Sequence, residues 1–61
     1  MEQIIKKLEK LGFVFNKQCN DGEVYMSRKR GYTTLYATIE VCGKVNGMNV
    51  NDFIAWVKNY K

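Results

Sequence analysis

The chain has 61 residues, 46% of them hydrophobic and 26% charged, and its ten basic and six acidic residues give a net charge of +4. This length predicts a single small domain, residues 1–61, and the composition is typical of a folded chain rather than a disordered one. With no histidine and only two cysteines, the chain lacks the usual residues of a structural zinc site and of histidine-dependent catalysis. We therefore expect no metal, no cofactor and no enzymatic activity.

The sequence also predicts a cytoplasmic protein. No apolar run is long enough to cross a membrane, and the first residues lack the apolar stretch and cleavage pattern of a secretory signal. Two cysteines, Cys19 and Cys42, are too few for a secreted disulfide scaffold of this size. We expect no membrane partner.

Residues 1–11 have the pattern of an amphipathic helix. Apolar side chains recur at i, i+3, i+4 and i+7 spacing, at Met1, Ile4, Ile5, Leu8 and Leu11. The opposite side carries Lys6, Lys7 and Lys10, and Gly12 stands where a helix C-terminal cap is usual. We expect a helix with one buried stripe and one basic, exposed face.

Three strands are predicted next, over residues 13–19, 23–28 and 32–41. The inward side chains expected from a period of two are Phe13, Phe15, Val24, Met26, Leu35, Ala37, Ile39 and Val41. Asn20-Asp21-Gly22 and Lys29-Arg30-Gly31 are turn signals between them. Two short connections predict an antiparallel meander.

The last part of the chain predicts a loop over residues 42–48 and a helix over residues 50–60. Asn49 suits the N-cap position. The apolar stripe of this helix is Val50, Phe53, Ile54 and Val57, with Trp56 and Tyr60 on its shoulder. The predicted fold is α+β in the order α-β-β-β-α: a three-stranded antiparallel meander with the N- and C-terminal helices packed on one face, because the strands offer only one apolar face.

The opposite sheet face is expected to stay open and to form a binding surface. The residues expected there are Tyr25, Ser27, Tyr32, Thr34, Tyr36 and Thr38, edged by Arg28, Lys29 and Arg30. Tyrosines stack on bases and neighbouring cations neutralise phosphates, as in single-strand binders. The lysines of the first helix could likewise follow a phosphate backbone. The plainer interpretation is that Tyr and Thr are favoured on any solvated strand and Lys on any solvated helix face.

Two functions fit these features. One is a nucleic-acid-binding module, for RNA or DNA, which the charge balance favours slightly. The other is a protein-binding inhibitor or adaptor from a phage or other mobile element, which would use the sheet face or Trp56 and Tyr60. The sheet margins could also pair with a partner or with a second copy to form a dimer.

The opening stretch of residues 4–13, IIKKLEKLGF, resembles the start of HicA-type toxins, which are small ribonucleases with the double-stranded-RNA-binding-domain fold. The resemblance implies the α-β-β-β-α order. The catalytic histidine of that family, in a Gly-Ser-His pattern, has no counterpart in residues 20–24, NDGEV. Residues 49–52, NVND, also lack the Lys-Lys pair with which double-stranded-RNA binders contact phosphates at the last helix. The resemblance therefore implies the architecture without the nuclease activity.

Overall fold

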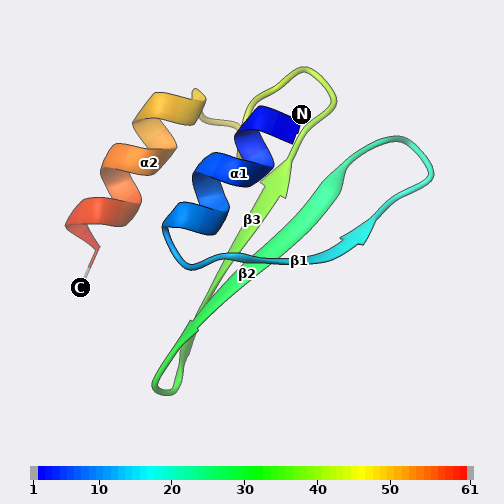
Figure 1. Ribbon diagram of the computed structural model, residues 1–61. Coiled ribbons are helices and arrows are strands. Elements are labelled where there is room, and N and C mark those ends of the chain that lie inside the picture. The colour runs from blue at the N-terminus through cyan, green and yellow to red at the C-terminus, as the bar shows by residue number, and fades with distance from the viewer. Residues whose placement is uncertain (1, 61) are drawn as a thin grey trace.

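The computed structural model describes residues 2–60 and contains two helices and three strands (Figure 1). These are α1 (Glu2–Lys10), β1 (Val14–Gln18), β2 (Val24–Arg30), β3 (Thr33–Ile39) and α2 (Val50–Asn59). The strands form one antiparallel sheet in the order β1-β2-β3. The predicted α+β fold with its α-β-β-β-α order is confirmed, and only the expected contribution of Met1 to α1 lies outside the described residues.

Helix α1 forms and ends as its sequence dictates. Leu8 is fully buried, and the other described members of the apolar stripe pack against the core as partly buried side chains. Gly12 adopts a φ of +96°, which residues other than glycine rarely adopt. Its N–H donates to the Glu9 carbonyl (3.0 Å), and the Phe13 N–H donates to the Leu8 carbonyl (3.1 Å). This pair of bonds is the Schellman arrangement that ends a helix and directs the chain into β1.

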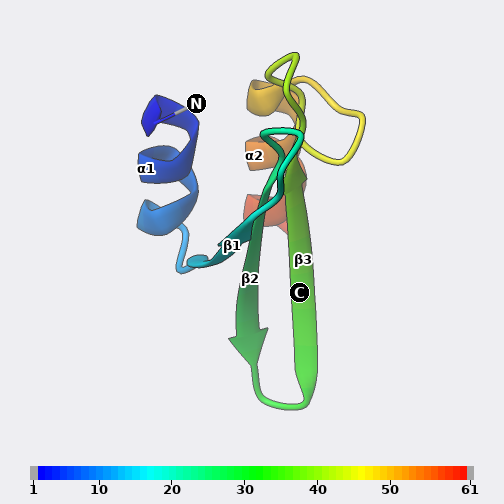
Figure 2. The same cartoon turned by 90° about the vertical axis from the view of Figure 1, so that its right-hand side faces the viewer.

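The β2–β3 hairpin is the longest part of the sheet. Its pairing runs without interruption from Val24 and Ile39 to Arg30 and Thr33, so Gly31 and Tyr32 alone form the turn. Strand β2 therefore ends two residues later than predicted, because Lys29 and Arg30 belong to the strand and not to the turn. The hairpin end extends beyond both helices, as the two perpendicular views show (Figures 1 and 2).

Both helices cover one face of this sheet. The fully buried side chains come from the helices, from the inward positions of β2 and β3, and from two connecting segments: Leu8, Phe13, Val24, Met26, Ala37, Ile39, Val45, Phe53 and Val57. The ring of Phe13 contacts that of Phe53 of α2, with centroids 6.0 Å apart. The inward alternation predicted for β2 and for the second half of β3 is confirmed.

Three core positions differ from the prediction. Phe15 pairs with Met26 and so faces the helix side, but it remains 48% exposed because the helices do not cover it. Val41 is 65% exposed because β3 ends at Ile39 and the chain turns there. Val45, expected in a loop, is fully buried and forms isolated bridges to Ile39 and Met48. Val45 therefore supplies the apolar side chain that Val41 was expected to supply.

The segment after β3 is held by polar contacts from one residue. Asn46 has a φ of +54°, a conformation that asparagine tolerates better than most residues. Its N–H donates to the Thr38 carbonyl (3.0 Å), and its side-chain Oδ1 accepts from the Thr38 N–H (2.8 Å). Its Nδ2 donates to the Tyr36 carbonyl (2.9 Å). The segment is thereby fixed along the outer edge of β3, and it leads to the N-cap of α2 at Asn49.

Candidate binding surfaces

The strand register sorts the predicted site residues onto opposite faces of the sheet. In antiparallel strands, paired residues share a face and successive residues alternate. Because Val24 and Met26 face the helices, the alternate residues Tyr25, Ser27 and Lys29 face away, together with the residues that pair with these three. The open face therefore carries Val14, Lys17, Tyr25, Ser27, Lys29, Thr34, Tyr36 and Thr38. Six of these lie in the neighbouring strands β2 and β3, as the sequence predicted: Tyr25, Ser27, Lys29, Thr34, Tyr36 and Thr38.

Arg28 and Arg30 lie on the other face. They follow Val24 and Met26 at the same alternate positions of β2, and they pair with Leu35 and Thr33 of β3. The expectation that the arginines edge the tyrosine face is therefore wrong. The tyrosines and arginines were expected to form one surface, but the sheet separates them.

Arg28 is engaged with its own chain. Its Nη1 donates to the carbonyl of Leu11 at the end of α1 (3.1 Å), and its guanidinium carbon lies 5.7 Å from the centroid of the Phe13 ring. Its Nε is buried and has no hydrogen-bond partner among residues 2–60. A cation at a helix C-terminus is stabilised by the exposed carbonyl groups there. Arg28 thus ties β2 to α1, a structural role that the sequence reasoning missed.

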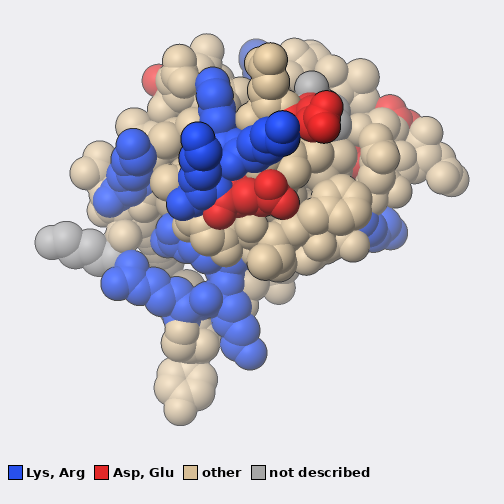
Figure 3. All heavy atoms as spheres, in the orientation of Figure 1, with Lys and Arg blue, Asp and Glu red and all other residues tan. Residues whose placement is uncertain are grey.

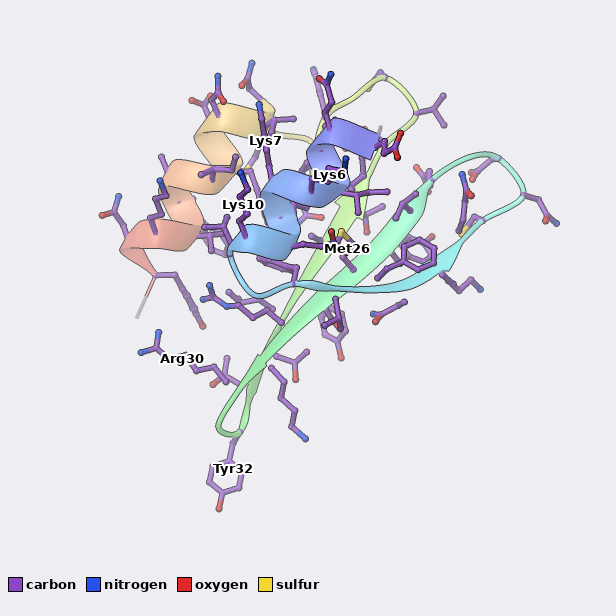
Figure 4. All side chains as sticks on the ribbon, viewed as in Figure 1. Lys6, Lys7, Lys10, Met26, Arg30 and Tyr32 are labelled. Carbon is purple, nitrogen blue, oxygen red and sulfur yellow. The ribbon has the colours of Figure 1, made fainter. Side chains whose placement is uncertain are left out.

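Tyr32 occupies the tip of the hairpin and belongs to neither face. It is fully exposed and points away from the rest of the molecule (Figure 4).

Tyr36 lies in a row across the open face and is 69% exposed. It pairs with Ser27 of β2, which in turn pairs with Val14 of β1. Asn16 is the extra residue of a bulge in β1, and its side chain exchanges hydrogen bonds with Ser27 (3.0 and 3.3 Å).

Tyr25, on the same open face, has a raised pKa. The largest cause is a hydrogen bond with the side chain of Cys19, followed by the negative charges of Cys19, Glu23 and Asp21 nearby. Cys19 is half-buried and Cys42 is exposed, and the two do not form a disulfide. The carboxylates of Asp21 and Glu23 therefore lie near this end of the open face, whereas Lys29 lies at the hairpin end.

The helix side carries a group of exposed cations. Lys6, Lys7 and Lys10 project from the outer face of α1, opposite the buried Leu8, and Arg30 lies beside the hairpin, below the C-terminal end of α2 (Figure 4). We call these four residues the basic surface. The space-filling view from this side shows Lys and Arg side chains gathered over α1 and toward the hairpin, with a smaller number of acidic side chains among them (Figure 3).

A pocket of about 170 Å³ lies between the hairpin and the end of α2, next to the basic surface. It is lined by Arg28, Arg30, Thr33, Leu35 and Tyr60. Tyr60 is the C-cap residue of α2, so the pocket brings together residues from the middle and the end of the chain. The sequence offered no signal for this juxtaposition, although the alternation of β2 could have placed the two arginines on one face.

Trp56 and Tyr60 form the end of an aromatic row on α2. The rings of Phe53 and Trp56 are 5.9 Å apart, and those of Trp56 and Tyr60 are stacked at 5.4 Å. Trp56 is half-exposed, so the row runs from the buried core to the surface. Both residues lie at the margin of the core, on the shoulder of the helix stripe as expected.

Among residues 2–60, no three His, Cys, Asp or Glu side chains come close enough together to hold a metal ion. Neither α1 nor α2 is long and apolar enough to span a membrane.

The resemblance to HicA-type toxins stays a prediction, because element order alone is compatible with many unrelated functions. The chain matches no family model, and no curated protein or solved structure matches it.

Proposed function

We propose that this protein is a small non-catalytic module that binds nucleic acid through the basic surface on its helix side. The observation that supports this proposal is the grouping of Lys6, Lys7, Lys10 and Arg30 on one side of the molecule (Figure 4). Exposed cations that follow one surface can neutralise successive phosphates and release the counterions condensed on the nucleic acid. Placing the contact on the helix side differs from the expectation of binding on the open sheet face.

The number of cations sets the expected salt dependence. Four phosphate contacts give a slope of log affinity against log salt of about −3.6 for duplex DNA and about −2.8 for a single strand. Between 50 and 200 mM salt, the duplex affinity should then fall about 100-fold. A titration of short DNA and RNA, single-stranded and duplex, by fluorescence anisotropy at several salt concentrations measures this slope directly.

Paired charge-removal variants test which surface is used. Lys7→Ala with Lys10→Ala removes two cations from the basic surface and should make the duplex slope less negative by about 1.8. Lys17→Ala with Lys29→Ala removes the same charge from the open sheet face and serves as the matched control. A larger effect of the control pair would contradict the proposed surface and favour the open face. A slope near zero for the unmodified protein would remove nucleic acid as the ligand.

A second candidate function is protein binding by the open sheet face. The observation in its favour is that Val14, Ser27 and Tyr36 form one row across the three strands, and that Val14 and Tyr36 are largely exposed. Exposed aromatic residues of this kind are enriched in binding hot spots. A complex that survives moderate salt and is lost with Tyr36→Ser would support an inhibitor or adaptor function.

A further inference from the structure

The pocket beside the basic surface contains two cations in a defined arrangement. Arg28 and Arg30 are two residues apart on β2 and face the same side, with Leu35 and Thr33 opposite them on β3. Tyr60 closes the pocket from the end of α2. The lining therefore offers two guanidinium groups and two hydroxyl groups, all of which can donate hydrogen bonds.

The two arginines differ in mobility. Arg28 is held by the Leu11 carbonyl and by the ring of Phe13, and its side chain is partly buried. One of its five N–H groups is used in that backbone contact and the Nε–H is buried, so three N–H groups of the two Nη atoms remain for a ligand in the pocket. Arg30 is exposed and reaches the pocket from the rim. One cation is thus fixed in advance, and the other can close over a bound group.

The size and charge of the pocket indicate which ligand it suits. Sites for drug-sized ligands have volumes of about 300–1,000 Å³, so a volume of about 170 Å³ suits a single small group. None of the five lining residues that the structure describes is acidic. Guanidinium groups bind both carboxylates and phosphates, often with two parallel hydrogen bonds.

Charge matching favours a phosphomonoester over the alternatives. A phosphomonoester carries a charge of about −1.5 to −2 at neutral pH and has three terminal oxygens that accept hydrogen bonds. A carboxylate and an internal phosphodiester each carry a single negative charge and two terminal oxygens. The two guanidinium groups and the hydroxyls of Thr33 and Tyr60 match the phosphomonoester in both charge and number of donors.

We propose that the pocket lined by Arg28, Arg30, Thr33 and Tyr60 binds the terminal phosphate of a nucleic-acid strand. This inference rests on the proposed function, because it assigns a strand end to a site next to the basic surface. The protein would then bind phosphorylated ends in preference to internal positions.

The first experiment compares three oligonucleotides of one sequence, with a 5′-phosphate, a 3′-phosphate or hydroxyl groups at both ends. We expect one phosphorylated form to bind about tenfold more tightly than the hydroxyl form, since hydrogen bonds to a charged group are worth at least that factor. Arg30→Ala should abolish the preference. Lys29→Ala removes the same charge from the adjacent residue on the opposite face and should preserve it. Equal affinities for the three forms, or a preference that persists in Arg30→Ala, would overturn the inference.

A second experiment separates this inference from the proposed function. Inorganic phosphate is titrated into the protein and into Tyr60→Phe, with chloride at equal ionic strength as the control, and amide and arginine Nε–H signals are followed by NMR. Saturable shifts at Arg30, Thr33 and Tyr60 that weaken in Tyr60→Phe would support the pocket even if no oligonucleotide binds. Absence of shifts at these residues would overturn the pocket, whereas salt-dependent oligonucleotide binding without end preference would leave only the basic surface.

Discussion

Arg28 should contribute more to stability than any other charged residue on the sheet, and Arg28→Ala tests this. The substitution removes the hydrogen bond to the Leu11 carbonyl and the cation over the Phe13 ring. It also removes the aliphatic part of the Arg28 side chain, which lies close to Gly12. A Cβ atom added at Gly12 would lie 3.2 Å from Arg28 Cδ. What then joins β2 to the end of α1 is the shared core, in which Leu8 and Phe13 belong to one cluster with Val24 and Met26.

The magnitude follows from these contacts. A hydrogen bond from a charged donor contributes about 1.5–3 kcal/mol, and a partly exposed cation over an aromatic ring about 0.5–1 kcal/mol. The buried, unpartnered Nε of Arg28 costs about 1–3 kcal/mol, and the truncation relieves that cost. The lost contacts of the partly buried aliphatic stem add about 1 kcal/mol, so the net loss should be about 2 kcal/mol. A chain of this length has a free energy of unfolding of about 3–9 kcal/mol, so the loss is a large share of it.

Urea denaturation followed by tryptophan fluorescence measures the loss. The midpoint should fall while the slope of the transition stays unchanged, and the melting temperature should fall by about 15 °C. Lys29→Ala, on the exposed side of the same strand, should change the free energy of unfolding by no more than about 0.5 kcal/mol. Arg28→Lys should lie between the two, because it keeps the charge but not the planar group. An Arg28→Ala protein as stable as Lys29→Ala would refute the reasoning.

Three further predictions concern the buried Val45, the helix cap at Gly12 and the pKa of Tyr25. Val45→Ala should destabilise by about 2 kcal/mol in urea, from two buried methyl groups and the cavity they leave, whereas Val41→Ala should be nearly neutral. Gly12→Ala should cost about 1–2 kcal/mol in the same assay, because its φ of +96° disfavours a side chain; unchanged stability would contradict that conformation. Cys19→Ala should lower the pKa of Tyr25 in an NMR pH titration, since it removes the largest cause of the raised value. Because that pKa is raised in the folded state, its stabilising contribution is present below about pH 10 and is lost as the pH rises through the folded pKa.

The element order could be predicted because each segment repeats its apolar residues at the period of its own structure. The stripe around Leu8, the alternation through Val24 and Met26, and the cap at Asn49 are local patterns, and local patterns are visible in a sequence. The residue at which a strand ends is harder to predict from the sequence. Val41 continues the alternation of β3, yet the strand stops earlier because the following segment folds back and buries Val45.

The candidate site was harder to predict because it depends on contacts between distant segments. Continuing the alternation of β2 past Met26 would have placed Arg28 and Arg30 on the helix side, but Lys29-Arg30-Gly31 also reads as a turn, which hid this signal. The contact between Arg28 and Leu11 and the approach of Tyr60 to the hairpin arise only from packing. No repeat of apolar or polar residues along the sequence predicts either contact.

The three hydrogen bonds of Asn46 have a consequence for self-association. An edge strand offers unpaired N–H and C=O groups to which another chain can add, and this is a common route to aggregation. Asn46 satisfies the outward N–H and carbonyl of Thr38 and the carbonyl of Tyr36. The backbone N–H and the side-chain amide of this one residue thus take the place of a neighbouring strand, and they close this part of the β3 margin to strand addition. Pairing with another chain is thereby limited to the hairpin half of β3 and to β1, where the bulge at Asn16 interrupts the regular ladder.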